Sequence, residues 1–198
     1  MRELFGILSG VLPIIGAYPY IRDILKHKTK PHRTSFLIWV VLDATAFASQ
    51  LAKGATWSLI MPAIGTIEVL TSFILSLKYG VGGFAKKDIV ALLLAGFGLI
   101  LWYFTKEPLT ALLIVIAIDV VGISLTILKT YEHPHTETFS TWLLSSIAGL
   151  FAAAAVGHLS FALLVYPLYI SIANAGVCAA ILLGRRKMST RSHSAKIG

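Results

Sequence analysis

The chain has 198 residues, of which 57% are hydrophobic and 13% are charged, and its formal net charge is +8. A soluble domain carries about 25% charged residues, so this composition excludes a soluble globular protein and indicates one with several membrane spans. No polar stretch is long enough to form a separate soluble domain.

Seven apolar segments approach or reach the roughly 20 residues that cross a bilayer core. In chain order they cover about 4–25, 34–52, 56–78, 89–105, 109–129, 138–156 and 160–184. Turn residues at 53–54 and 106–108 separate neighbouring spans. We therefore predict an all-α membrane protein with seven transmembrane helices, followed by a polar, basic tail that we expect to be disordered.

One sequence pattern occurs twice in the chain. It reads PHRTSFLIW at 31–39 and PHTETFSTW at 134–142, an offset of 103 residues (134 − 31), and each copy leads into an apolar span. Many small transporters consist of internal repeats. The pattern predicts a first three-helix repeat at 1–84, a linker helix at 85–107, a second three-helix repeat at 108–186 and the tail at 187–198.

The distribution of Lys and Arg predicts the orientation of the spans. With the amino terminus outside, 14 of the 17 Lys and Arg residues fall on the cytoplasmic side, which is the positive-inside pattern. The prediction is thus N-out and C-in, with two repeats that run parallel because the linker helix resets the chain direction. The same bias accounts for the net charge, so we expect no nucleic-acid partner. We expect a multi-pass protein of the plasma (inner) membrane and leave a homo-oligomer open.

Three carboxylates lie near the middle of predicted spans, at Asp43, Glu68 and Asp119, and Asn174 lies at similar depth. Each carboxylate at mid-bilayer costs about 2.5–3.5 kcal/mol on insertion scales. No Lys or Arg lies deep in a span to neutralise them, so they must pair with protons, one another, water or substrate. Helical spacing places them on faces with small and polar residues, which predicts a shared wet cavity for substrate binding or proton coupling.

Prolines interrupt several of the predicted spans. Pro13 and Pro19 lie in the first, Pro62 in the third and Pro167 in the last, where each frees a backbone carbonyl and bends its helix. Pro62 and Pro167 stand at nearly equivalent places in the two repeats. We predict that bent helices of this kind serve as hinges.

The segment around the first loop resembles the PQ-loop signature of SWEET, SemiSWEET and PQ-loop transporters. It has Pro19-Tyr20 near the end of the first span, then a basic loop at 26–30, then Ser35 and Trp39, although the family has Gln where Tyr20 stands. The resemblance covers about 18–39 and 133–142 at the level of motif. It implies a three-helix bundle for each repeat and a substrate bound between the bundles at mid-membrane.

The resemblance also implies roles for individual residues. SWEET proteins bind sugar with an Asn on the third span of each repeat; Asn174 lies where the second of these would be, and Glu68 lies near the first. The resemblance makes Trp39 and Trp142 candidate aromatic walls or gates of the substrate site. The candidate hinge and gate residues are Pro19, Tyr20, Pro62 and Pro167.

These features favour a transporter that works by alternating access on a sugar or on a polar or cationic metabolite, with proton coupling left open. A receptor-like ligand-binding protein on the same scaffold is the alternative. We expect no enzyme activity, because the spans contain no HExxH, Ser-His or aspartyl-protease pattern, and no cofactor. The loop histidines could bind a metal ion, but no Cys accompanies them and we expect no metal site.

Overall fold

The computed structural model of the chain describes residues 1–83, 85–86, 89–90, 92–93, 96–97, 100, 104 and 107–194. Six helices in this part are long and apolar enough to cross a membrane. The helices are α1 Arg2–Leu25, α2 Arg33–Ala52, α3 Ile60–Tyr79, α5 Pro108–Glu132, α6 Phe139–Val156 and α7 Phe161–Ser194, with short 3-10 turns η1 Trp57–Leu59 and η2 Pro134–Thr136.

These helices confirm six of the seven predicted spans, and they indicate a multi-pass integral membrane protein. The predicted fourth span at 89–105, and with it most of the linker helix at 85–107, lies largely outside the described residues. The helix ends follow local signals. His32 caps α2 by accepting a hydrogen bond from the backbone N–H of Ser35 at 3.4 Å, and α6 ends at Gly157, whose φ of 74° is left-handed.

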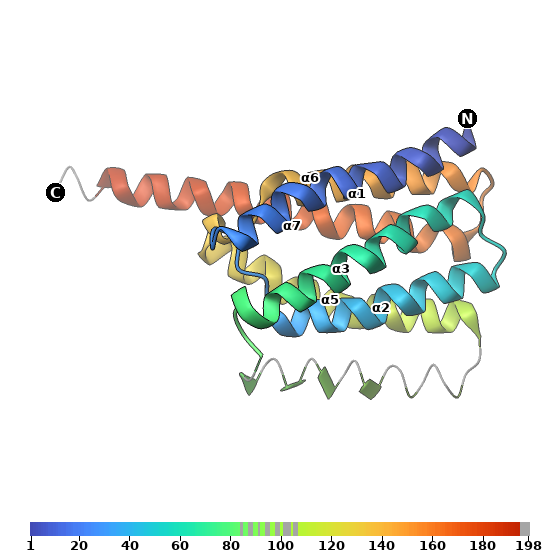
Figure 1. The fold of residues 1–198 in the computed structure, drawn as a ribbon, viewed down its shortest axis with the longest axis horizontal. Coiled ribbons are helices and arrows are strands. Elements are labelled where there is room, and N and C mark those ends of the chain that lie inside the picture. Colours follow the sequence, from blue (N-terminus) through green and yellow to red (C-terminus); the bar gives the residue numbers. More distant parts are fainter. Residues whose placement is uncertain are drawn as a thin grey trace.

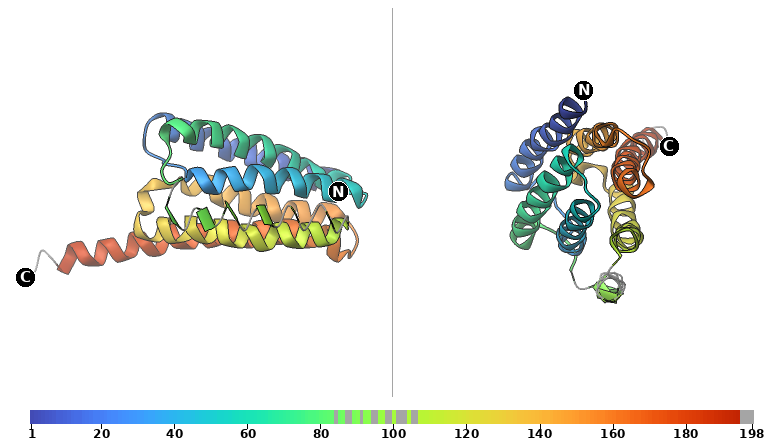
Figure 2. Two further views of the ribbon diagram at one scale, coloured as in Figure 1. Left: turned by 90° about the horizontal axis from the view of Figure 1, so that it is seen from below. Right: turned by 90° about the vertical axis from the view of Figure 1, so that its right-hand side faces the viewer.

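The six helices pack as a closed ring in the order α1, α3, α2, α5, α7, α6, with α6 returning to α1. An end-on view shows this ring (Figure 2, right). Helices α1, α3, α5 and α7 run in one direction along the bundle, and α2 and α6 run in the other (Figure 1). In each group of three consecutive helices, the third therefore packs between the first and the second.

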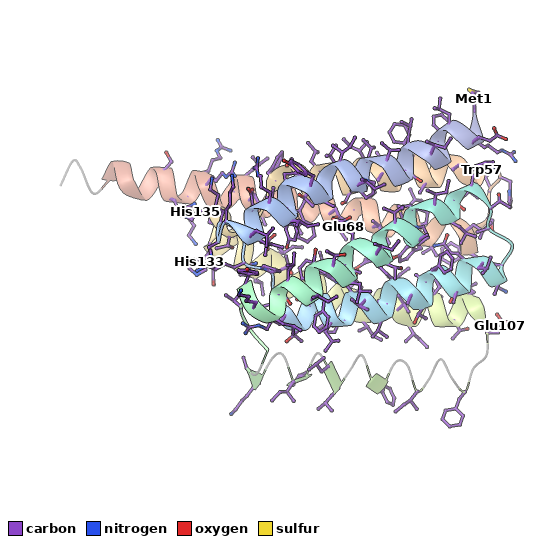
Figure 3. The ribbon with its side chains drawn as sticks, in the orientation of Figure 1. Met1, Trp57, Glu68, Glu107, His133 and His135 are labelled. Atoms are coloured by element: carbon purple, nitrogen blue, oxygen red, sulfur yellow. The ribbon has the colours of Figure 1, made fainter. Side chains whose placement is uncertain are left out.

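The two ends of the bundle differ in charge. The end that carries His133 and His135 (Figure 3) also carries the carboxyl ends of α1, α3 and α5, and we call it the basic end. Among the described Lys and Arg residues, only Arg2 and Lys53 lie at the opposite end. This separation of charge along the bundle matches the pattern from which the orientation is predicted.

The carboxyl end of the chain differs from the sequence prediction. The tail at 187–198 is predicted to be disordered, but α7 continues as a helix to Ser194 and projects beyond the basic end of the bundle (Figure 1). Extending a helix that has already formed adds one hydrogen bond for each residue fixed, so propagation is cheap once the membrane span has nucleated it. Arg185, Arg186, Lys187 and Met188 are also good helix formers.

Candidate functional site

A cavity of about 120 Å³ lies where the six helices meet. Glu68, one of its lining residues, is halfway between the two ends of the bundle (Figure 3). Every helix of the ring contributes to the wall. The lining residues are Pro13 and Tyr20 of α1; Phe36, Trp39 and Asp43 of α2; Met61, Pro62, Gly65, Glu68 and Val69 of α3; Asp119 and Ile123 of α5; Thr141, Trp142, Ser145 and Ala148 of α6; and Tyr166, Ile170, Ala173 and Asn174 of α7.

The structure brings most of the predicted site residues together in this wall. All six residues predicted to bind substrate or couple protons line the cavity, although they come from five different helices. Of the four predicted hinge or gate residues, Tyr20 and Pro62 line it. Pro19 is half-buried and Pro167 is fully buried, and both lie outside the described lining.

Asp119 is the most enclosed of the three carboxylates, with 7% of its surface exposed. It accepts hydrogen bonds from the indole N–H of Trp39 on α2 and, at 2.7 Å, from the hydroxyl of Tyr169 on α7. Gly122, one turn further along α5, lies beside this contact, and a Cβ there would be 3.4 Å from the Trp39 nitrogen, an ordinary van der Waals distance. The carboxylate of Asp119 thus joins three helices.

Asp43 and Glu68 are half-buried and lie on neighbouring helices of the first half. Asp43 accepts a hydrogen bond of 2.5 Å from the hydroxyl of Tyr166. Its second oxygen lies against Gly65, where a Cβ would stand 3.4 Å away. Glu68 follows Gly65 by about one helical turn on the cavity side of α3, and among the described residues no hydrogen bond reaches its carboxylate.

Asn174 uses part of its amide within its own helix. Its side-chain N–H₂ donates to the backbone carbonyl of Ile170 at 2.7 Å, and the residue lines the cavity on the α7 side. One donor position and the carbonyl oxygen of the amide are not used by this bond. Asn174 therefore remains able to contact a molecule in the cavity.

Four aromatic side chains form a closed ring of contacts on the side of the cavity that faces the basic end. We call Tyr20, Phe36, Trp39 and Trp142 the aromatic ring cluster. The ring centroids are 6.0 Å apart for Tyr20–Phe36, 4.8 Å for Phe36–Trp39, 5.9 Å for Trp39–Trp142 and 6.4 Å for Trp142–Tyr20. All four side chains are buried. Tilted and edge-to-face contacts at such distances are favourable, so the cluster closes the cavity toward this end.

A buried ion pair lies beyond the aromatic ring cluster. Glu137, in the connection between α5 and α6, pairs with the ammonium group of Lys129 and accepts a hydrogen bond of 3.0 Å from the indole N–H of Trp142. Lys129 also donates to the backbone carbonyl of Lys30 at 3.1 Å. The pair therefore ties the loop before α2 to the loop before α6, directly under the ring.

The charge of the cavity is strongly one-sided. Three carboxylates line it, and among the described lining residues there is no Lys, Arg or His. Such a wall can hold protons, a cation or a polar solute with hydrogen-bond donors, and it offers no cation to neutralise an anionic group. No group of three or more His, Cys, Asp or Glu side chains in the described part of the chain could hold a metal ion.

The comparisons with known proteins add no relative. No protein-family model, curated protein or solved structure matches the chain.

Three functional candidates were missed by the sequence reasoning. Tyr166 and Tyr169 hold two of the carboxylates, and Glu137 forms the ion pair under the ring. The spacing of the tyrosines is a signal that could have found them, because residues three apart share a helix face and a tyrosine hydroxyl inside a membrane needs a partner. Glu137 stands inside the second copy of the repeated pattern, where the first copy has Thr34.

Tyr20 provides a test of how the cavity is built. Its side chain is 2% exposed, and its hydroxyl lies beside the carboxylate of Glu137 without a hydrogen bond of ordinary geometry. We expect Tyr20→Phe to change the free energy of unfolding by no more than about 1 kcal/mol, because the hydroxyl that is removed makes no well-formed hydrogen bond. Titration of SDS into mixed micelles measures this. Tyr166→Phe, which removes the bond to Asp43, should destabilise the protein by more, and equal losses in both variants would contradict the assignment.

Proposed function

We propose that the chain is a small-molecule membrane transporter of the SWEET and PQ-loop type, which works by alternating access around the central cavity. The first half, 1–84, and the second half, 108–186, would rock against each other with the cavity between them. The orientation would be N-out and C-in in the plasma (inner) membrane. The substrate would be a sugar or a polar or cationic metabolite, with proton coupling as a further possibility.

The packing of the helices supports two equivalent halves. Exchanging α1 with α5, α2 with α6 and α3 with α7 converts each main helix contact of the ring into another contact of the ring. The paired helices also run in the same direction (Figure 1). This is the relationship expected of parallel repeats, whose substrate sites lie at the repeat interface near the midplane.

A detail at the basic end supports the same division. Gly80 follows α3, and a Cβ there would stand 2.5 Å from the carbonyl of Pro31. Gly184, at the corresponding place in α7, leaves 3.2 Å between a Cβ and the ring of Pro134. In both halves a glycine thus packs against the proline that begins the repeated pattern, although Gly80 follows the end of α3 and Gly184 lies inside α7.

The observation that carries the proposal is the cavity itself. It lies between the halves, is lined by all six described spans, holds three carboxylates and is closed on one side by the aromatic ring cluster. A midplane site closed at one end is what one state of an alternating-access carrier requires. Of the predicted hinge positions, Pro167 lies inside α7, the helix at the centre of the second half. Pro62 lies in the first turn of α3, where a proline removes no helical hydrogen bond, so the prediction that it bends its helix is wrong.

Uptake into proteoliposomes tests the proposal. We expect the purified protein to move solute, and we expect Asp119→Asn and Glu68→Gln to lower the uptake rate by about tenfold or more, since each removes a charge that a substrate or coupling proton would use. Glu3→Gln, an exposed carboxylate at the start of α1, is the matched control and should leave uptake unchanged.

Two outcomes would redirect the proposal. Unchanged uptake in both cavity variants would exclude the carboxylates from transport. Thermal stabilisation by a solute that never crosses the membrane would instead select the receptor-like alternative on the same scaffold.

A further inference from the structure

The wall of the cavity indicates a narrower class of ligand than the one named in the proposed function. The substrate class follows from three separate features of the wall, which are its charge, its unused polar atoms and its aromatic closure. The inference rests on the proposed function in one respect, which is that the ligand is called a substrate. The features of the wall themselves bear on which ligand binds.

The charge of the wall excludes a ligand with a carboxylate or phosphate group. Asp43, Glu68 and Asp119 line the cavity, and no described lining residue is basic. The ammonium group of Lys129 lies beyond the aromatic ring cluster and is already paired with Glu137 and the carbonyl of Lys30. An anionic group in the cavity would therefore face three carboxylates with no cation to offset them.

The hydrogen bonds of the wall identify the acceptors that remain for a ligand. Asp119 accepts at both oxygens, from Trp39 and Tyr169, whereas Asp43 accepts at one oxygen, from Tyr166. Glu68 has no such partner in the described part of the chain, and it is half-buried on the cavity side of α3. A carboxylate away from water is costly unless donors reach it, and an ammonium or guanidinium group supplies several charge-assisted donors at once.

One observation independent of the acids points to the same ligand. The four rings of the aromatic ring cluster lie along one side of the cavity, and the faces of Trp, Tyr and Phe attract organic cations. The cavity therefore combines an unpaired carboxylate with an aromatic wall.

The volume limits the size of the ligand. A water molecule occupies roughly 10–15 Å³ of such a cavity. A cavity of about 120 Å³ therefore holds on the order of ten non-hydrogen atoms.

We infer that the substrate is a small organic amine or guanidine that carries no carboxylate, with its cationic group bound between Glu68 and the aromatic ring cluster. Amino acids, including the basic ones, are excluded because they carry a carboxylate group, which such an amine lacks.

Matched pairs of compounds test this inference on the purified full-length protein. Agmatine and arginine differ by one carboxylate, as do cadaverine and lysine. We expect agmatine or cadaverine to bind at least about tenfold more tightly than its amino-acid partner, and Glu68→Gln to weaken that binding by about tenfold or more. Glu3→Gln should leave it unchanged. Calorimetry measures binding, and proteoliposomes measure uptake of the same compounds.

The outcomes separate the inference from the proposed function. Binding of an amine without uptake supports the ligand class and contradicts transport. Uptake of arginine, lysine or glucose in preference to the amines supports transport and overturns the ligand class. Failure of both amines to bind, or binding unaffected by Glu68→Gln, also overturns the inference.

Discussion

Lys129→Met is expected to lower the free energy of unfolding by about 3–5 kcal/mol, the usual cost of leaving one partner of a buried ion pair alone. The side chain of Glu137 is 1% exposed, and Lys129 is its charged partner. Without the ammonium group, the indole N–H of Trp142 at 3.0 Å and the neighbouring hydroxyl of Tyr20 remain to stabilise the carboxylate. Titration of SDS into mixed micelles measures the loss.

A substitution of Glu137, the other member of the ion pair, tests this expectation. In the Lys129→Met background, Glu137→Gln should recover most of the stability, because it removes the uncompensated charge and keeps an acceptor for Trp142. Lys26→Met is the matched control, since Lys26 lies 103 residues earlier, at the corresponding place after α1, and its side chain is exposed. Its effect should stay within about 0.5 kcal/mol. Additive losses in the double variant would show that the pair does not act as a unit.

The described spans could be predicted from the sequence because span length and apolar composition are local properties. Each of the six apolar segments coincides with a helix to within a few residues, except that α7 continues past its predicted end. The position of the carboxylates was predictable for the same reason, since helical spacing fixes which residues share a face. Asp43, Glu68 and Asp119 accordingly line one cavity.

The partners of these carboxylates could not be predicted, because they come from distant helices. Tyr166 is 123 residues from Asp43 in the chain, and Tyr169 is 50 residues from Asp119. Which hydroxyl reaches which carboxylate depends on the rotation and depth of α7 in the ring. Glu137 is a similar case, because its burial depends on how the loops of the two halves meet.

The two tryptophans of the repeated pattern illustrate how equivalent residues acquire different roles. Trp39 donates to Asp119 inside the cavity, whereas Trp142 donates to Glu137 on the far side of the aromatic ring cluster. The residue 103 positions before Asp119 is Gly16, which has no side chain to accept a hydrogen bond. Its carbonyl accepts instead from Thr141 at 2.8 Å. The indole N–H of Trp142 therefore turns toward Glu137, and the two copies of the pattern contribute unequally to the wall of the cavity.

If the aromatic ring cluster closes the cavity, removal of one ring should open it to the basic end. We expect Trp142→Ala to raise the labelling rate of a cavity cysteine, reached from the basic end, by on the order of tenfold or more, because a bulky apolar constriction excludes water and solutes. Ser145→Cys supplies the reporter, since Ser145 lines the cavity one turn beyond Trp142. The background carries Cys178→Ala, which removes the single native thiol.

The side of the membrane can be controlled with a protease site fused after the tail, because α7 projects beyond the basic end as far as Ser194 (Figure 1). A membrane-impermeant thiol reagent is then applied to vesicles in which that site is accessible. Leu143→Ala is the matched control, because the neighbouring Leu143 is 40% exposed on the outside of the bundle and should leave labelling unchanged. Trp142→Leu, which keeps more of the packing volume, should give an intermediate rate and guards against loss of the fold. The test requires that Trp142→Ala and the parent are both monodisperse. If they are then labelled equally fast, the cavity already opens to the basic end, and the four rings do not separate it from water.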